Sequence, residues 1–168
     1  MNEQETKDLI IKTIREYDKT SSFAQRKVAD TPTDALQVAN KNYVDRKALQ
    51  MVVFAPASDV TTGDGKFYVH IDSRLNKLKL NDVHAEVITA GTTNTTDIQI
   101  ANVNGAVDML STKLTLDSGE TGSDTAATPA VINPANARVT LNDVLRIDVD
   151  AVSTTAPKGL IITLGFVI

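Results

Sequence analysis

The stretch VLRIDVDAV, residues 144–152, decides how this chain is interpreted. Its apolar residues alternate strictly with charged ones, with Leu145, Ile147 and Val149 set against Arg146, Asp148 and Asp150. A period of two residues is that of a β-strand with one face on a core and the other in solvent. The sequence therefore predicts an amphipathic strand here.

Similar segments lie on both sides of this strand. They are residues 51–54, 66–71, 83–89, 97–103, 112–117 and 159–168. The last, GLIITLGFVI, is almost wholly apolar, which predicts a central strand buried on both faces. Turn signals such as Gly63–Gly65 and Asn133–Asn136 separate the segments, with no helical pattern between them. We expect a mainly β domain of seven or eight antiparallel strands, a β-sandwich for which the jelly roll is the preferred architecture.

The first 50 residues show a helical pattern instead, and no glycine occurs before Gly63. An apolar stripe formed by Leu9, Ile10, Ile14 and Tyr17 follows the spacing of one helix face. A helix of about four turns is marginal alone in water, so the stripe must be buried. It packs either on the chain's own β-domain or on another protein.

A second helix is predicted to begin at Thr31, an N-cap residue followed by Pro32 at the first helical position. Val44, Ala48 and Met51 continue a helical spacing of four and then three residues, with Tyr43 beside them. We expect these four residues to form a short helical collar between chains, because the repeat is too short to sustain a coiled coil. The predicted division is a helical anchor and collar over residues 1–50 and a β-sandwich knob over residues 51–168.

Composition and charge exclude several classes of function. Of the 168 residues 42% are hydrophobic and 23% charged, the balance of a globular protein. The net charge of -4 comes from the β-rich part, which argues against a nucleic-acid partner. The absence of cysteine excludes disulfides and cysteine-ligated zinc. No apolar run reaches the ~20 residues of a membrane span, and no secretory signal is evident, so we expect synthesis in the cytoplasm.

The residues with catalytic or metal-binding chemistry form no recognised motif. His70 and His84, with Glu86, lack a metal-ligand spacing. Asp148 and Asp150 share a strand face, as paired carboxylates of glycosidases do, but so do the acids of any solvated strand. The acidic loop residues Asp59, Asp64 and Asp124 lack EF-hand spacing. We therefore predict no catalytic residue, no metal site and no cofactor.

Two polar loops remain as candidate binding surfaces, residues 92–96 and 118–128. The residues predicted to face a receptor are Thr92, Thr93, Asn94, Thr95, Thr96, Glu120 and Asp124. Their hydroxyl, amide and carboxyl groups suit a sugar or protein surface. A plain β-hairpin loop explains the threonine-rich run as well, and is the preferred explanation.

One segment resembles a known family. Thr31–Asp45 reads TPTDALQVANKNYVD and resembles the Pro-Thr-Asp-Ala … Asn-Lys-x-Tyr-Val-Asp segment of tail-fibre and other appendage proteins of tailed bacteriophages, where it precedes a trimeric β-rich part. The β-rich part also resembles the jelly-roll domains of phage head-fibre and decoration proteins. The segments that carry this second resemblance are Gly65–Ile71, Leu75–Leu80, Val83–Val103, Asp117–Gly122 and Asp143–Asp150.

The resemblance implies a structural protein of the phage virion, most simply a homotrimeric head fibre or decoration protein. Leu9, Ile10, Ile14 and Tyr17 would anchor it to capsid or neck/tail proteins, and the collar would align three chains. The alternative is a tail receptor-binding module that recognises a host-surface glycan or protein through the two loops. A third hypothesis, a polysaccharide depolymerase, finds no residues in the sequence to carry it.

Overall fold

The computed structural model describes residues 4–6 and 46–168, and the structural statements below concern these residues. The chain divides into two units, Met1–Val44 and Asp45–Ile168. Residues 4–6 are helical, and the second unit is mainly β. The predicted anchor residues Leu9, Ile10, Ile14 and Tyr17 and the collar residues Tyr43 and Val44 lie outside the described residues.

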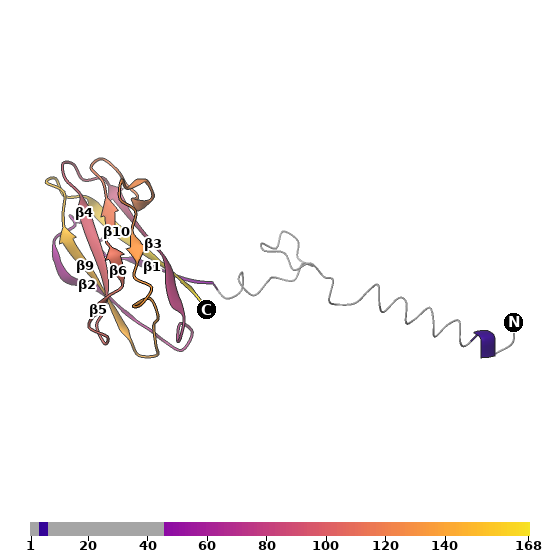
Figure 1. Ribbon diagram of the computed structural model, residues 1–168. Helices are drawn as coiled ribbons and strands as arrows, with labels where there is room; N and C mark the ends of the chain where they lie inside the picture. Colours follow the sequence, from indigo (N-terminus) through magenta and orange to yellow (C-terminus); the bar gives the residue numbers. More distant parts are fainter. Residues whose placement is uncertain (1–3, 7–45) are drawn as a thin grey trace. The chain divides into compact units, whose positions relative to one another are not determined.

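Ten strands and one short 3-10 helix make up the β-domain (Figure 1). In chain order they are β1 (Lys47–Val52), β2 (Gly63–His70), β3 (Lys79–Thr89), β4 (Thr96–Asn102), β5 (Val107–Asp108), β6 (Leu110–Thr112), β7 (Leu114–Leu116), η2 (Ser123–Thr125), β8 (Val131–Ile132), β9 (Val144–Ala151) and β10 (Lys158–Val167). Strands β2, β4, β9 and β10 match the predicted segments to within three residues, but β1 and β3 each begin four residues earlier. The sequence does not predict the short strands β5 and β8, so the described residues form ten strands where the sequence predicts seven or eight.

The strands form two principal antiparallel sheets. One has three strands in the order β1-β10-β3, and the other has five, in the order β2-β9-β4-β5 with β7 also paired to β4. A further two-stranded sheet joins β6 to β8. The predicted antiparallel, mainly β fold is confirmed.

The core lies between the inward faces of the two principal sheets. From β9 it receives Leu145, Ile147 and Val149, all fully buried, as the alternation in residues 144–152 predicts. From β10 it receives Leu160, Ile162, Leu164 and Phe166. One continuous cluster of apolar side chains therefore holds both sheets together.

Strand β10 is central in its sheet, but only one of its faces is buried. Its outward residues Ile161, Thr163, Gly165 and Val167 are partly exposed. The expectation of burial on both faces is wrong for this reason, although the central position is right. The outward face of β10 thus presents apolar and small side chains, flanked by the polar residues Gln50 on β1 and Asp82, His84 and Glu86 on β3.

The predicted helical spacing through Ala48 and Met51 is wrong, because Lys47–Val52 is a strand. It pairs with β10 along its whole length, from Lys47 opposite Phe166 to Val52 opposite Ile161. Met51 is 8% exposed and belongs to the core. Backbone pairing and burial override a helical pattern in so short a segment. The β-domain therefore begins at Lys47, before the predicted boundary at residue 51.

The strand pairs are nested. The first strand pairs with the last, β2 with β9, and β4 with β7, while β3 is flanked by residues 121–122. Because β3 and β4 belong to different sheets, the threonine-rich loop between them crosses from one sheet to the other. The preferred explanation of that loop as a plain hairpin is thus wrong.

The nesting gives the β-domain two distinct ends (Figure 1). The chain enters at Lys47, and its C-terminus follows the paired residue Phe166 at the same end, here called the basal end. The opposite, apical end carries the loops of residues 53–62, 90–95, 117–122 and 152–157, which flank the other ends of the same strands. Ten residues of β10 separate the ends, about 33 Å at ~3.3 Å per residue.

A buried side chain repairs an irregular stretch of the five-stranded sheet. The segment after β4 stays bonded to it through Met109, whose N–H donates to the Ile100 carbonyl at 2.8 Å, and pairs with it again from Leu114, while residues 110–113 leave the ladder. The Gln99 Oε1 accepts the N–H groups of Ile100 (2.9 Å) and Leu110 (3.3 Å), and its Nε2 donates to the Leu110 carbonyl (3.2 Å). Gln99 is 6% exposed, so these backbone groups have little access to water.

Replacement Gln99→Ala is expected to destabilise the domain by roughly 2–3 kcal/mol, because it leaves buried N–H and C=O groups without partners. Chemical denaturation monitored by circular dichroism measures this change. Gln50→Ala is the matched control, since Gln50 is exposed and makes one long contact of 3.4 Å to Thr163. Equal stability of the two variants would contradict the repair role of Gln99.

Candidate functional site

Three apical loops are tied into one platform. The N–H groups of Thr92 and Thr155 each donate to the carbonyl of the other residue, both at 3.1 Å. Thr154 N–H donates to the Thr93 carbonyl at 2.8 Å. The third loop joins through Gly119 N–H, which donates to the Gly91 carbonyl at 2.8 Å, and Ser118 Oγ, which accepts Thr93 N–H at 2.8 Å. The predicted loops 92–96 and 118–128 thus meet, together with residues 153–155, which sequence reasoning missed.

The base of this platform is a buried hydrogen-bonded pair. Ser153 N–H donates to Thr96 Oγ1 at 3.1 Å, the two hydroxyls are 3.1 Å apart, and Ser153 Oγ donates to the Asn94 carbonyl at 3.3 Å. Gly91 packs so closely that a Cβ there would lie 2.7 Å from Ser153 Oγ. Thr96 is 0% exposed, so its predicted receptor-facing role is wrong: it supports the loop instead.

The backbone at the tip of the platform is strained. Thr93 and Asn94 have φ angles of 62° and 66°, in the left-handed region that favours glycine. Asparagine tolerates this region, whereas a β-branched threonine rarely adopts it, at a cost of about 1–2 kcal/mol. Strain at an exposed loop persists only where the surroundings impose it. The bonds to Ser118 and Thr154 are what impose it here.

The other predicted receptor-facing residues are placed as follows. Thr92, Thr93 and Asn94 are exposed and Thr95 is partly exposed. Glu120 follows the tied Gly119 and accepts the Thr125 hydroxyl at 2.8 Å. The exposed Asp124 lies instead beside β3, where its carboxylate is 2.7 Å from the Nδ1 of His84.

That last contact brings serine, histidine and aspartate side chains together, but not in the arrangement of a catalytic triad. Ser123 Oγ and Asp124 Oδ1 both face the same ring nitrogen, His84 Nδ1, at 3.3 and 2.7 Å. A triad needs the serine at the opposite ring nitrogen. Ser123 Oγ also accepts the Ala85 N–H at 2.9 Å, which ties η2 to β3. These contacts hold Ser123 and Asp124 of η2 against β3.

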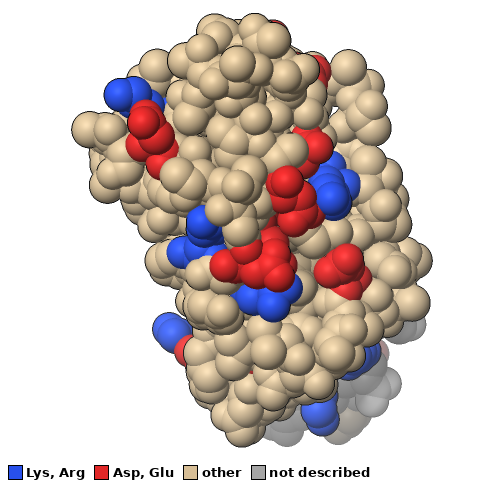
Figure 2. All heavy atoms as spheres, turned by 90° about the vertical axis from the view of Figure 1, so that its left-hand side faces the viewer, with Lys and Arg blue, Asp and Glu red and all other residues tan. Residues whose placement is uncertain are grey.

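Charged side chains gather on the outward face of the five-stranded sheet, and Figure 2 shows acidic and basic groups intermixed on that side of the domain. Asp148 is buried and lies 2.7 Å from the Nε of Arg146, which also reaches Asp64 at 3.4 Å. The hydrogen bond to Asp148 raises the pKa of Arg146 above its usual value. Asp148 also accepts the Gly65 N–H at 2.8 Å, which positions the turn at the start of β2.

Asp150, the second of the two carboxylates predicted on this face, pairs with Lys113 at 2.8 Å. The hydrogen bond that Lys113 donates to this carboxylate raises the pKa of Lys113, and the negative charges of Asp150, Asp97 and Asp108 add to the effect. Asp148 therefore pairs with Arg146, and Asp150 pairs with Lys113. This arrangement is a network of ion pairs across a sheet face.

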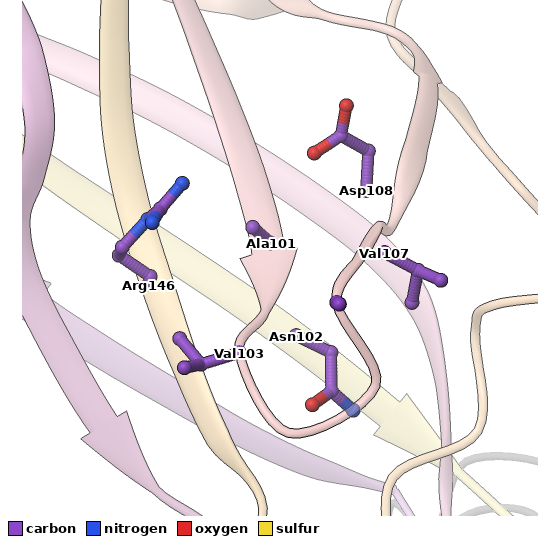
Figure 3. A pocket seen from close by; sticks show the side chains of 7 residues that line it. Ala101, Asn102, Val103, Val107, Asp108 and Arg146 are labelled. Carbon is purple, nitrogen blue, oxygen red and sulfur yellow. The ribbon is translucent and has the colours of Figure 1, made fainter.

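A shallow depression of about 360 Å³ lies beside this network (Figure 3). Its floor is Ala101 on β4, with Arg146 on one side and Asp108 on the other. Val103 and Val107 complete the rim. The depression exists because a small residue stands between larger ones on adjacent strands, a juxtaposition that the alternating sequence pattern does not reveal.

Comparison with known protein families, curated proteins and solved structures finds no match to this chain. Within residues 4–6 and 46–168, no group of three or more His, Cys, Asp or Glu side chains is arranged to hold a metal ion. In that same part of the chain, no helix has the length and apolar character needed to cross a membrane.

Replacement Asp148→Ala is expected to destabilise the domain by about 2–3 kcal/mol, because Arg146 and the Gly65 N–H lose a buried acceptor. Asp150→Ala removes a more exposed pair on the same strand and should cost less than about 1 kcal/mol. Thermal denaturation of both variants measures the difference. If Asp150→Ala proves as damaging as Asp148→Ala, the assignment of Asp148 as the structural carboxylate fails.

Proposed function

We propose that this protein is a structural component of a tailed-phage virion, most simply a trimeric head fibre or decoration protein. Residues 1–45 attach it to the particle, and the β-domain projects outward. The observation that carries the proposal is that the two ends of the β-domain differ. The attached segment enters at the basal end, and the tied polar loops lie about one strand length away at the apical end.

The nested strand pairing supports a jelly roll. This fold is a long hairpin rolled up so that outer and inner strand pairs alternate between two sheets. Here β1 pairs with β10 in one sheet and β2 with β9 in the other, followed by β3 beside residues 121–122 and β4 with β7. Jelly rolls are common in viral capsid proteins. The resemblance of Thr31–Asp45 to phage appendage proteins adds to the same proposal.

The outward face of the three-stranded sheet supports self-association. Val52 and Ile88 are each 54% exposed, and Ile161, opposite Val52 in the register, lies between their strands. Ile88 packs over Gly159, two residues from Ile161 on the same face of β10, so the three apolar side chains form one patch, which is bordered by the exposed Glu86 opposite Ile161. The outward face of the other sheet carries ion pairs instead. We assign the apolar patch to contacts between copies of the chain in the trimer.

Fewer of the predicted collar residues are available for contacts between chains than the sequence indicates. Ala48 is exposed at the basal end and is free to contact a neighbouring chain, whereas Met51 is committed to its own core. Contacts by Tyr43 and Val44 remain a prediction. A collar would then place three basal ends together and three apical platforms apart from the particle.

The second candidate function is a tail receptor-binding module that recognises a host-surface glycan or protein. The observation that favours it is the platform of three joined loops at the end opposite to the point of entry. Location of the protein on particles, by labelling and electron microscopy, separates the two candidates. Labels on the head support a fibre or decoration protein, and labels on the tail support the receptor-binding module.

Ile14→Asp is expected to weaken incorporation into particles without lowering the melting temperature, because the apolar stripe is proposed to contact the virion. Deletion of residues 1–30 should abolish incorporation and leave the β-domain folded. Quantification of the protein in purified particles measures incorporation, and thermal denaturation measures the melting temperature. Incorporation of the deletion variant at the full level would refute the anchor, and a melting temperature lowered by Ile14→Asp would place the stripe on its own domain.

The double variant Val52→Asp, Ile88→Asp should convert a trimer into a monomer, because charge on the apolar patch opposes burial between copies. Light scattering of the full-length protein at several concentrations measures its mass. Leu141→Asp is the matched control, since Leu141 is 48% exposed at the basal end and outside the patch. A wild-type monomer, or a variant that stays trimeric, would exclude this face as the interface.

A further inference from the structure

We infer that the apical platform is a binding site for neutral carbohydrate and that Thr93 is its specificity-determining residue. This deepens the receptor-binding part of the proposed function and rests on it for the outward orientation of the platform and for its repetition on a trimer and on a particle. The site is the apical polar cluster, which consists of Thr92, Thr93, Asn94, Ser118, Thr154 and Thr155. These residues are all exposed and come from three loops joined by the hydrogen bonds described above.

The strain at Thr93 is the first step of the argument. Glycine would occupy a φ of 62° without a steric penalty, so a threonine there sacrifices stability for its side chain. The Thr93 backbone is fully used, because its N–H donates to Ser118 Oγ and its carbonyl accepts from Thr154. Its hydroxyl has no hydrogen-bond partner among the described residues. The strained conformation therefore presents an exposed hydroxyl that the fold itself does not need.

The rigidity of the cluster is the second step. Asn94 Nδ2 donates to Thr154 Oγ1 at 3.1 Å, and the base of the loop is closely packed, since a Cβ at Gly91 would lie 2.7 Å from Ser153 Oγ and 2.9 Å from the Thr155 carbonyl oxygen. The hydroxyls of Thr92 and Thr155 are, like that of Thr93, without partners in the described part of the chain. Polar groups held in place before binding lose little entropy when a ligand binds.

The chemistry of the cluster selects the ligand class. Residues 90–95 and 153–156 contain no charged side chain, and the third loop, residues 117–122, adds only the carboxylates of Asp117 and Glu120 and no cation. A phosphate, a nucleic acid or an anionic sugar would need cations, which this platform lacks. Protein interfaces are typically anchored by aromatic and arginine side chains, and none is present here. Hydroxyl and amide groups act as both donors and acceptors, which matches the neutral hydroxyls of a hexose or N-acetylhexosamine.

A single platform without an aromatic ring binds weakly, because no stacking contribution is available. Repetition of the platform compensates for this. Copies on one trimer, and many trimers on one particle, raise the effective concentration of each platform near a polysaccharide surface. The inference therefore predicts low affinity for one site and high avidity for the assembled protein.

The test uses full-length protein and an immobilised panel of neutral oligosaccharides built from hexoses and N-acetylhexosamines, with sialylated and sulfated oligosaccharides alongside. Wild-type protein should bind members of the neutral set in preference to the anionic set. Thr93→Gly should lower the apparent affinity at least about tenfold, while its melting temperature stays the same or rises. Thr93→Ser, which keeps the hydroxyl, should retain most of the binding.

Asn142→Gly is the matched control, because Asn142 has a φ of 71° in an exposed turn at the basal end. It should preserve binding. No binding to any neutral oligosaccharide, or binding that Thr93→Gly leaves unchanged, would overturn the inference. Binding to cells that persists after removal of their surface sugars would also overturn it, in favour of a protein receptor. Incorporation of Thr93→Gly protein into particles is measured separately, so a failure of virion assembly is distinguished from a failure of sugar binding.

Discussion

The position of β10 between β1 and β3 is the constraint on which the rest of the domain depends. The last strand of the chain supplies four inward side chains to the core and the pairing partners of two other strands. Lys47 and Phe166, at opposite ends of the β-domain sequence, are direct neighbours in this pairing. Such non-local contacts require the closure of long loops before they stabilise anything. The three-stranded sheet therefore cannot form until the whole chain is available.

Irregular stretches of the sheets are repaired by buried polar side chains. Gln99 replaces the missing backbone partners where the strand beside β4 bulges, and Asp148 holds the turn at Gly65 while neutralising Arg146. At the basal end, Asp143 accepts the Thr140 N–H and the Asn102 amide, which closes the turn before β9. Each of these side chains compensates for a local departure from ideal pairing. Their burial makes the compensation strong, because water cannot replace it.

The two ends of the domain connect the fold to its proposed role. A nested arrangement places the entry point and the C-terminus at one end and collects the crossing loops at the other. Three of these loops are tied into a rigid platform, and its strained tip carries hydroxyl groups that the fold does not use. The two outward sheet faces also differ: one carries the apolar patch of Val52, Ile88 and Ile161 beside the polar residues Asp82, His84 and Glu86, and the other carries a network of ion pairs. Attachment, self-association and recognition can thus occupy separate surfaces.

By itself the sequence determined the mainly β character of the part of the chain that follows Met51, because the two-residue alternation in β9 leaves no other way to bury one face. It also located the polar loops and the inward set Leu145, Ile147 and Val149. It did not determine that Ala48 and Met51 lie on a strand, because a short segment satisfies a helical and an extended pattern equally well, and its partner β10 is over a hundred residues away. Nor did it reveal that Thr96 is buried while Thr93 is exposed, since neighbouring threonines are chemically identical. Only the crossing of that loop between the sheets, and its bonds to residues 118 and 153–155, decided which hydroxyl supports the fold and which one faces outward.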